Sequence, residues 1–324
     1  MRDFAKPVVV LSQCLELQPC RFDGQVIPNS FVKQLAPYVT LIPVCPEMEI
    51  GLGVPREPVR IIVVKGQQRL IQPATNLDLS DRMQRFAQRF LASLDAVDGF
   101  ILKSRSPSCG IKDVRAYLGV QKGAATKLTS GFFARAVLER FPGVAIEDEG
   151  RLTNFKIREH FLTKLFALAS LRSVATSPSM KALIRFHTAN KFLLMAYSQK
   201  ELRNLGRIVA NPERKPIADV IEQYRTHFQA ALARPARTPS IINVLQHGLG
   251  YFSDKLSGKE KAFFLQSLQM YRQGKIPLSA VVSILRAWVV RFENTYLMEQ
   301  TFFEPYPEAL VEISDSGRGR PLSV

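Results

Sequence analysis

The sequence predicts an α/β N-terminal domain with a mostly parallel sheet, followed by an all-α helical domain. In residues 1–150, short runs rich in Val and Ile alternate with segments of helical periodicity. From about residue 152 the strand-like runs cease, and apolar residues recur at i, i+3 and i+4. Because the chain has 324 residues and 46% apolar content, it is long enough for two domains that each bury a core.

The first half contains five strand-like runs, each short and bounded by Gly, Pro or polar residues: 7–11, 39–44, 59–64, 99–102 and 144–147. The clearest intervening helix is expected at Leu79–Leu94, where Ser80 is a suitable N-cap and the apolar residues share one face. Another helix is expected at Ser130–Phe141. Alternation of this kind is typical of a mostly parallel sheet covered on both faces by helices.

The second half predicts helices throughout. Turn signals such as Asn211-Pro212 separate segments at 153–176, 179–197, 200–209, 216–233, 239–256, 258–273 and 278–298. We therefore expect an α/β domain at 1–150, a helical domain at 151–312 and a disordered tail at 313–324.

The net charge of +16 is unevenly distributed. Residues 1–150 hold 19 Lys and Arg against 15 Asp and Glu, whereas residues 151–324 hold 25 against 13. An excess of this size predicts a polyanionic partner, with nucleic acid favoured over an anionic membrane. No run approaches the roughly 20 apolar residues of a membrane-spanning helix, so we expect a cytoplasmic protein with no membrane partner. Nothing in the sequence implies an obligate protein partner.

Three of the four cysteines follow strand-like runs: Cys14, Cys45 and Cys109. Ligand sites of open parallel sheets lie beyond the carboxyl ends of the strands, so the three thiols are expected at one edge. Thiolates there suit a metal or an iron–sulfur cluster, while the alternative is that each cysteine is a small buried hydrophobe. The surrounding loops, rich in Pro, Gly, Ser and charge, favour a site.

The segments CLELQPCRFDG, CPEMEIGLGVPREP and LKSRSPSCG resemble the three signature loops of the thiouracil desulfidase (TudS) family, over about the first 150 residues. The helical remainder resembles the YbgA-like domain through RFHTANKFLLMAYS and LRNLG. The combination is similar to the two-domain tRNA 4-thiouridine desulfidases.

The resemblance implies that Cys14, Cys45 and Cys109 ligate a 4Fe-4S cluster with one open iron. The thiocarbonyl sulfur of 4-thiouridine in tRNA would bind that iron. The oxygen of a water molecule would then replace the sulfur on the pyrimidine carbon without net redox change, giving uridine and hydrosulfide. Glu47, two residues after Cys45, is the expected acid–base group, and Ser106 the second catalytic residue. The expected substrate-binding residues are Ser104, Ser108, Lys103 and Arg56.

In the helical half, tRNA contacts are expected from two basic pairs at i, i+4 spacing, Lys181 with Arg185 and His187 with Lys191. His187 is also compatible with a buried, hydrogen-bonded histidine. Cys20 has no assigned role.

Three alternatives remain open. The substrate of the same chemistry could be free thiouracil or a thionucleoside. The protein could instead be a non-enzymatic iron–sulfur sensor that binds nucleic acid, with Cys20 as a fourth ligand. Finally, the three thiolates could hold zinc in a hydrolase.

Overall fold

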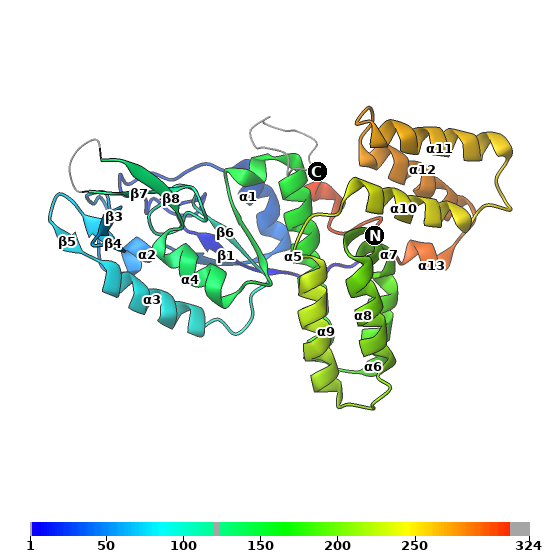
Figure 1. Ribbon diagram of the computed structural model, residues 1–324, viewed down its shortest axis with the longest axis horizontal. Helices are drawn as coiled ribbons and strands as arrows, with labels where there is room; N and C mark the ends of the chain where they lie inside the picture. Colours follow the sequence, from blue (N-terminus) through cyan, green and yellow to red (C-terminus); the bar gives the residue numbers. More distant parts are fainter. Residues whose placement is uncertain (1, 120–123, 312–324) are drawn as a thin grey trace. The chain divides into compact units, whose positions relative to one another are not determined.

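The computed structural model describes residues 2–119 and 124–311, which form two compact units (Figure 1). Among the described residues, the α/β unit comprises 4–169 and 309–311, and the helical unit comprises 2–3 and 170–308. The units divide inside helix α5 (Phe155–Thr176), whereas the expected boundary near residue 150 falls in the turn before this helix. The expected disordered tail lies outside the described residues.

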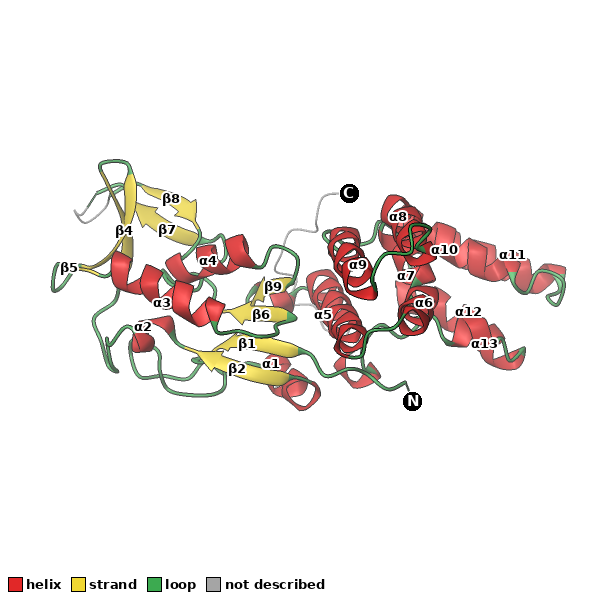
Figure 2. Ribbon diagram, turned by 90° about the horizontal axis from the view of Figure 1, so that it is seen from below, coloured by secondary structure: helices red, strands yellow, loops and turns green. Residues whose placement is uncertain are grey.

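The α/β unit is built on a four-stranded sheet that is parallel throughout, in the order β2-β1-β6-β9 (Figure 2). Its strands are β1 (Val8–Ser12), β2 (Thr40–Val44), β6 (Gly99–Leu102) and β9 (Ala145–Asp148). The chain runs outward from β1 to β2, then returns to the other side of β1 as β6. This reversal creates a crevice at the carboxyl ends of β1 and β6, where parallel α/β sheets bind ligands.

Short and long helices connect and cover these strands: α1 (Ser30–Leu35), η1 (Ala36–Tyr38), α2 (Pro46–Glu49), α3 (Ser80–Ala92), α4 (Phe132–Arg140) and η2 (Arg151–Thr153). Helix α3 buries Met83, Phe86 and Leu91, and the Phe86 ring stacks on Phe133 of α4. Helix α5 packs on the sheet at Gly99, where an added Cβ would lie 2.8 Å from Leu165. The two helices expected in this half, Leu79–Leu94 and Ser130–Phe141, are therefore present with slightly shorter bounds.

A second, five-stranded sheet was not expected. Its order is β5-β4-β3-β7-β8, and its strands are β3 (Arg60–Val64), β4 (Gln67–Gln72), β5 (Leu77–Asp78), β7 (Val114–Tyr117) and β8 (Thr126–Thr129). Strand β3 was expected in the parallel sheet but belongs here, where it pairs antiparallel with β4 and parallel with β7. The other four strands are only two to six residues long and mix polar with apolar residues, so they lack the apolar runs of a doubly covered strand.

The periodicity predicts the positions of the helices in the helical unit: α6 (Met180–Ala189), α7 (Lys191–Tyr197), α8 (Gln199–Ala210), α9 (Ile217–Ala231), α10 (Thr238–Gly250), α11 (Gly258–Arg272), α12 (Leu278–Arg291) and α13 (Thr295–Met298). The segment expected as one helix at 278–298 is divided into α12 and α13, and one short helical turn was not expected, η3 (Glu308–Leu310). This turn spans the boundary between the units. The segment expected as one helix at 179–197 is broken at buried Asn190, whose side chain donates to the Phe186 carbonyl at 2.8 Å. One core cluster of this unit centres on Phe264, Leu285 and Trp288.

A search of the described residues for a helix both long and apolar enough to cross a bilayer finds none.

A candidate iron–sulfur active site

The ends of three adjacent strands bring cysteines to one cavity of about 300 Å³. Cys14 lies two residues after β1, Cys45 directly follows β2, and Cys109 lies within the loop between β6 and β7. All three side chains line the cavity, with Cys45 and Cys109 buried and Cys14 partly exposed. The convergence expected from the strand ends is therefore present in the structure.

Cys20 lines the same cavity and is buried. Its thiol hydrogen bonds with the side chains of Cys14 and Cys45, and the bond with Cys14 raises the pKa of Cys20 to about 11. The hydrogen bond with Cys20, followed by burial, raises the pKa of Cys45, and burial raises that of Cys109. Without a bound metal the thiols of Cys45 and Cys109 are protonated at neutral pH, so a metal that binds them must release their protons.

Glu47 reaches the cavity from α2, the short helix that starts immediately after Cys45. The Arg56 guanidinium donates to Glu47 Oε2 from two nitrogens, Nε at 2.8 Å and Nη2 at 2.6 Å. The Ser108 hydroxyl donates to the other oxygen, Oε1, at 2.9 Å. The Glu47 and Arg56 side chains are only 13% and 5% exposed, so this is an ion pair shielded from solvent.

Arg56 also ties together the loops around Glu47. Its Nη1 donates to the carbonyls of Cys20 at 3.0 Å and Gly53 at 2.9 Å. Its backbone N–H donates to the Phe22 carbonyl at 2.8 Å. One buried guanidinium therefore fixes the carboxylate relative to the Cys20 loop.

Ser106 shapes the loop that presents Cys109. Its hydroxyl oxygen accepts from the backbone N–H groups of Ser108 at 3.2 Å and Cys109 at 3.1 Å. A serine hydroxyl has two acceptor lone pairs and one donor hydrogen, so the hydrogen remains available to the cavity that Ser106 lines.

The start of α4 anchors the same loop. The N–H groups of Phe132 and Phe133 donate to the carbonyls of Pro107 at 3.0 Å and Ser108 at 2.9 Å. This approach requires Gly131, because an added Cβ would lie 2.5 Å from the Ser108 carbonyl oxygen. The helix N-terminus therefore holds Pro107 and Ser108 in place and, through them, Cys109.

Lys103 and Ser104 line the cavity but are bound by a carboxylate that the sequence did not single out, Glu149. The Lys103 ammonium forms an ion pair with Glu149 Oε1, and the Ser104 hydroxyl and N–H each contact this carboxylate at 2.7 Å. Glu149 directly follows β9, so the strand-end reasoning that selected the cysteines could also have found it.

Two further expected substrate-binding residues have defined structural partners. Ser108 is fully buried, is absent from the cavity lining and donates to Glu47. Arg56 lines the cavity, with its guanidinium engaged by Glu47 and two carbonyls. Both side chains therefore act on Glu47, and only the nine-residue separation of Glu47 and Arg56 could have indicated this pairing from the sequence.

Among the expected RNA contacts, Lys181, Arg185 and Lys191 are exposed. His187 is only 6% exposed, and its Nδ1 lies 3.1 Å from the hydroxyl of buried Tyr224. Burial lowers the pKa of His187 to about 4, so the ring is uncharged at neutral pH. The expectation that it shares a basic surface with Lys191 is wrong, because the ring points into the core and the helix ends between them.

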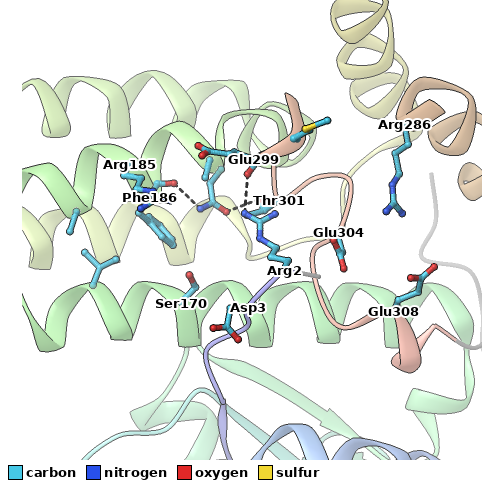
Figure 3. A pocket seen from close by; sticks show the side chains of 15 residues that line it. Arg2, Asp3, Ser170, Arg185, Phe186, Arg286, Glu299, Thr301, Glu304 and Glu308 are labelled. Carbon is cyan, nitrogen blue, oxygen red and sulfur yellow. Dashed lines mark hydrogen bonds between the residues drawn. The ribbon is translucent and has the colours of Figure 1, made fainter. Parts of the chain in front are cut away.

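Arg185 lines a separate cavity of about 820 Å³ in the helical unit (Figure 3). There Arg2 donates to the Glu299 carbonyl at 2.9 Å. The lining carries three arginines and four carboxylates: Arg2, Arg185, Arg286, Asp3, Glu299, Glu304 and Glu308. Because the carboxylates outnumber the arginines, this cavity is not expected to bind RNA phosphates.

The donor set of the α/β cavity suits an iron–sulfur cluster. Among the residues that the structure describes, no group of three or more His, Cys, Asp or Glu side chains is arranged to hold a single metal ion. In a 4Fe-4S cluster each cysteine binds a different iron. Cys14, Cys45 and Cys109 approach the cavity from three strand ends, and soft thiolates are the ligands such clusters take.

Two separate segments of the chain match protein-family models. Residues 9–149 match the family described as 2-thiouracil desulfurase, and residues 191–307 match the one described as a protein of unknown function, DUF1722. The first part of the chain is therefore similar to the 2-thiouracil desulfurase family and the second part to DUF1722.

Individual relatives cover one half of the chain at a time. The uncharacterized protein YbgA of Escherichia coli (strain K12) is 29% identical over 151 residues, which are 46% of this chain and 89% of YbgA. The uncharacterized protein YbbK of Bacillus subtilis (strain 168) is 28% identical over 154 residues, 45% of this chain and 99% of YbbK. A solved structure of the [4Fe-4S]-dependent thiouracil desulfidase TudS is 29% identical, with a TM-score of 0.36, over 45% of this chain and 93% of TudS.

Proposed function

We propose that this protein is an iron–sulfur-dependent desulfidase that converts the C=S group of 4-thiouridine in tRNA to C=O. One water is consumed, a C=O bond replaces the C=S bond, and the sulfur leaves as hydrosulfide with no net redox change. The observation that carries the proposal is the single cavity that Cys14, Cys45 and Cys109 share with Glu47 and Ser106, within a domain that matches the 2-thiouracil desulfurase family.

The three strand-end cysteines would hold a 4Fe-4S cluster, leaving one iron without a protein ligand. When bound, the cluster supplies a Lewis-acidic iron that attracts the soft thiocarbonyl sulfur and makes the C=S carbon electrophilic. The remaining chemistry is the activation of water beside that carbon, which the protein's own side chains perform.

Glu47 is the proposed base. Two nitrogens of Arg56 occupy its Oε2, whereas Oε1 accepts only the Ser108 hydroxyl. Each carboxylate oxygen accepts at least two hydrogen bonds, so Oε1 has room for a water molecule. That water gives a proton to Oε1 as its oxygen attacks the carbon, and this proton then leaves with the sulfur as hydrosulfide. The second proton of the water passes to solvent as the C=O bond forms.

Ser106 is the proposed donor to substrate. Both of its lone pairs face backbone N–H groups, which directs its O–H hydrogen away from the loop. A hydrogen bond from this group to the pyrimidine or to the attacking water holds the reacting atoms in line.

The charge of the second half supports tRNA as the substrate. Residues 151–324 carry an excess of 12 basic residues, and Lys181, Arg185 and Lys191 are exposed. The rival substrates are free thiouracil and thionucleosides. A free base needs only a pocket, so the added basic helical domain favours tRNA over these smaller substrates. Assays of the cluster-loaded protein on thiolated tRNA and on free 4-thiouracil separate the two. Turnover of tRNA supports the proposal, and turnover of the free base alone contradicts it.

One observation favours a second function, a nucleic-acid-binding iron–sulfur sensor. Cys20 contacts Cys14 and Cys45 in the same cavity, which makes a fourth thiolate available to the cluster. Cys20→Ser distinguishes the two functions. The desulfidase proposal predicts that this variant retains the cluster's visible absorption and its turnover, whereas a sensor with four cysteine ligands loses its cluster stability.

The metal content of the purified protein distinguishes an iron–sulfur desulfidase from a zinc hydrolase. Protein purified without oxygen is expected to contain about four iron and four acid-labile sulfide per chain. Stoichiometric zinc without sulfide rejects the cluster.

A further inference from the structure

A second groove, of about 660 Å³, lies in the α/β unit between the five-stranded sheet and the loop that carries Cys109. The side chains that define it are Arg60 of β3, Arg115 and Tyr117 of β7, Leu128 of β8, and Arg105 and Pro107 of the loop. Nothing in the proposed chemistry uses this surface.

Strand alternation turns these residues outward. In β7, Val114 and Ala116 are buried, so Arg115 and Tyr117 project from the opposite face. Arg115 pairs with Leu128 across the β7–β8 ladder, and Leu128 is 65% exposed. The groove therefore presents an exposed apolar side chain next to cationic ones.

The charge of the groove is positive. Three arginines line it against one carboxylate, Asp113. Asp113 approaches Arg105 at 3.9 Å, and the Arg105 side chain is 86% exposed. Within the part of the chain that the structure describes, no ion pair engages Arg60 or Arg115. These two guanidinium groups are available to an anionic partner.

An aromatic ring lies among the cations. The Arg60 guanidinium stands 5.3 Å from the centroid of the Tyr117 ring. Alternating guanidinium and aromatic groups are what single-stranded nucleic acid binds, because the cations contact phosphates and the rings stack on bases.

The groove adjoins the cysteine cavity. Arg105 and Pro107 line both, and the Arg105 backbone is held at a φ of 58° while its N–H donates to Asp113 at 3.0 Å. By contrast, the lining of the basic groove at Arg82, Arg85 and Arg89 of α3 shares no residue with the cysteine cavity. The α3 groove is thus a surface of similar charge without access to the site.

We propose that the groove at Arg60, Arg115 and Tyr117 binds the RNA strand adjacent to the thiolated nucleotide, leading that nucleotide past Arg105 into the cysteine cavity. The inference rests on the proposed function for the identity of the target nucleotide. It assigns to the desulfidase domain a share of RNA binding in addition to that expected of the helical domain.

The experiment measures fluorescence anisotropy of a labelled ten-nucleotide single-stranded RNA bound to the full-length protein over a range of NaCl concentrations. The double variant Arg60→Ala/Arg115→Ala is expected to bind at least about fivefold more weakly and to reduce the slope of log K against log salt by about 1.4, because two phosphate contacts are lost. The control Arg82→Ala/Arg85→Ala removes the same charge from α3 and is expected to leave both quantities near wild type. Equal effects of the two double variants, or no effect of the first, overturn the proposal.

Tyr117 gives an independent test. Tyr117→Ala is expected to weaken RNA binding several-fold without changing the salt slope, since stacking releases no counterions, while Tyr117→Phe retains binding. Binding is read without turnover, so these results do not depend on the desulfidase activity. The rate at which Arg60→Ala/Arg115→Ala desulfurises free 4-thiouridine is expected to equal that of the wild type. If this variant loses as much turnover on the free nucleoside as on tRNA, the groove does not act on the RNA strand alone.

Discussion

Arg56 and Glu47 form a buried ion pair in which two guanidinium nitrogens, at 2.8 and 2.6 Å, contact the same carboxylate oxygen. This asymmetry leaves Oε1 as the oxygen that can accept from water. The pair thus connects the loop GLGVPREP to the short helix after Cys45, and it explains why a carboxylate beside the cysteines has a fixed orientation.

Arg56→Lys is expected to lower kcat by roughly 10- to 100-fold with little change in KM, because lysine cannot make both contacts and Glu47 loses its orientation. Iron content is expected to stay at the wild-type level, since Arg56 is not a thiolate ligand. Steady-state kinetics with parallel iron analysis measures both. An unchanged kcat with normal iron content removes Arg56 from the positioning of Glu47.

Glu47→Gln is expected to retain the cluster but lower kcat by at least about 100-fold, since the amide cannot accept the proton from water. Glu49→Gln is the matched control, because Glu49 lies on the same short helix and is exposed. Absorbance of the cluster and single-turnover desulfuration measure the two effects. A fully active Glu47→Gln protein rejects this residue as the base.

Gly131→Ala is expected to lower the free energy of unfolding by about 2–4 kcal/mol, because its Cβ would overlap the Ser108 carbonyl oxygen at 2.5 Å. The displaced loop also carries Cys109, so cluster retention is expected to fall. Gly258→Ala is the control, as no atom lies within 4 Å of its added Cβ. Urea unfolding and iron analysis test the pair, and equal stabilities of the two variants contradict the close packing of α4 on the loop.

His187 is expected to make stability depend on pH. Burial lowers its pKa to about 4 from an ordinary value of 6.5, so between these values the unfolded chain binds a proton that the folded chain does not. Stability therefore falls as the pH is lowered from 7 to 5. The contribution of His187 to that loss is about 1–2 kcal/mol.

Urea unfolding at pH 7 and pH 5 measures this contribution. His187→Gln is expected to show a smaller loss between the two pH values than wild type, while His247→Gln, which alters an exposed histidine of α10, is expected to behave as wild type. The same pH dependence in all three proteins would show that His187 is not buried uncharged.

The elements that the sequence predicts well are those whose residues bury a continuous apolar surface. Strands β1, β2, β6 and β9 lie at the expected positions, and the cysteines that follow the first three converge because parallel strands share an edge. Strand β3 shows the limit of this reasoning, since an apolar run such as Arg60–Val64 does not specify which sheet it joins. The second sheet was missed because strands such as Thr126–Thr129 are short and largely exposed.

Side-chain roles depend on contacts between distant residues and were predicted less well. The sequence selected Glu47 and Arg56 for separate tasks, whereas the fold pairs them. It placed His187 on an RNA-binding face, although Tyr224, 37 residues later, holds it in the core. Helical spacing identifies a face but does not say which face packs inward when apolar and basic residues alternate.

The most direct test of the account is nucleoside analysis of thiolated tRNA after incubation with the anaerobically purified, cluster-loaded protein, without added reductant. The account predicts that 4-thiouridine is lost while uridine and hydrosulfide appear in equal amounts, and that Cys109→Ala abolishes the conversion together with the cluster. Unchanged 4-thiouridine in the presence of an intact cluster would contradict it.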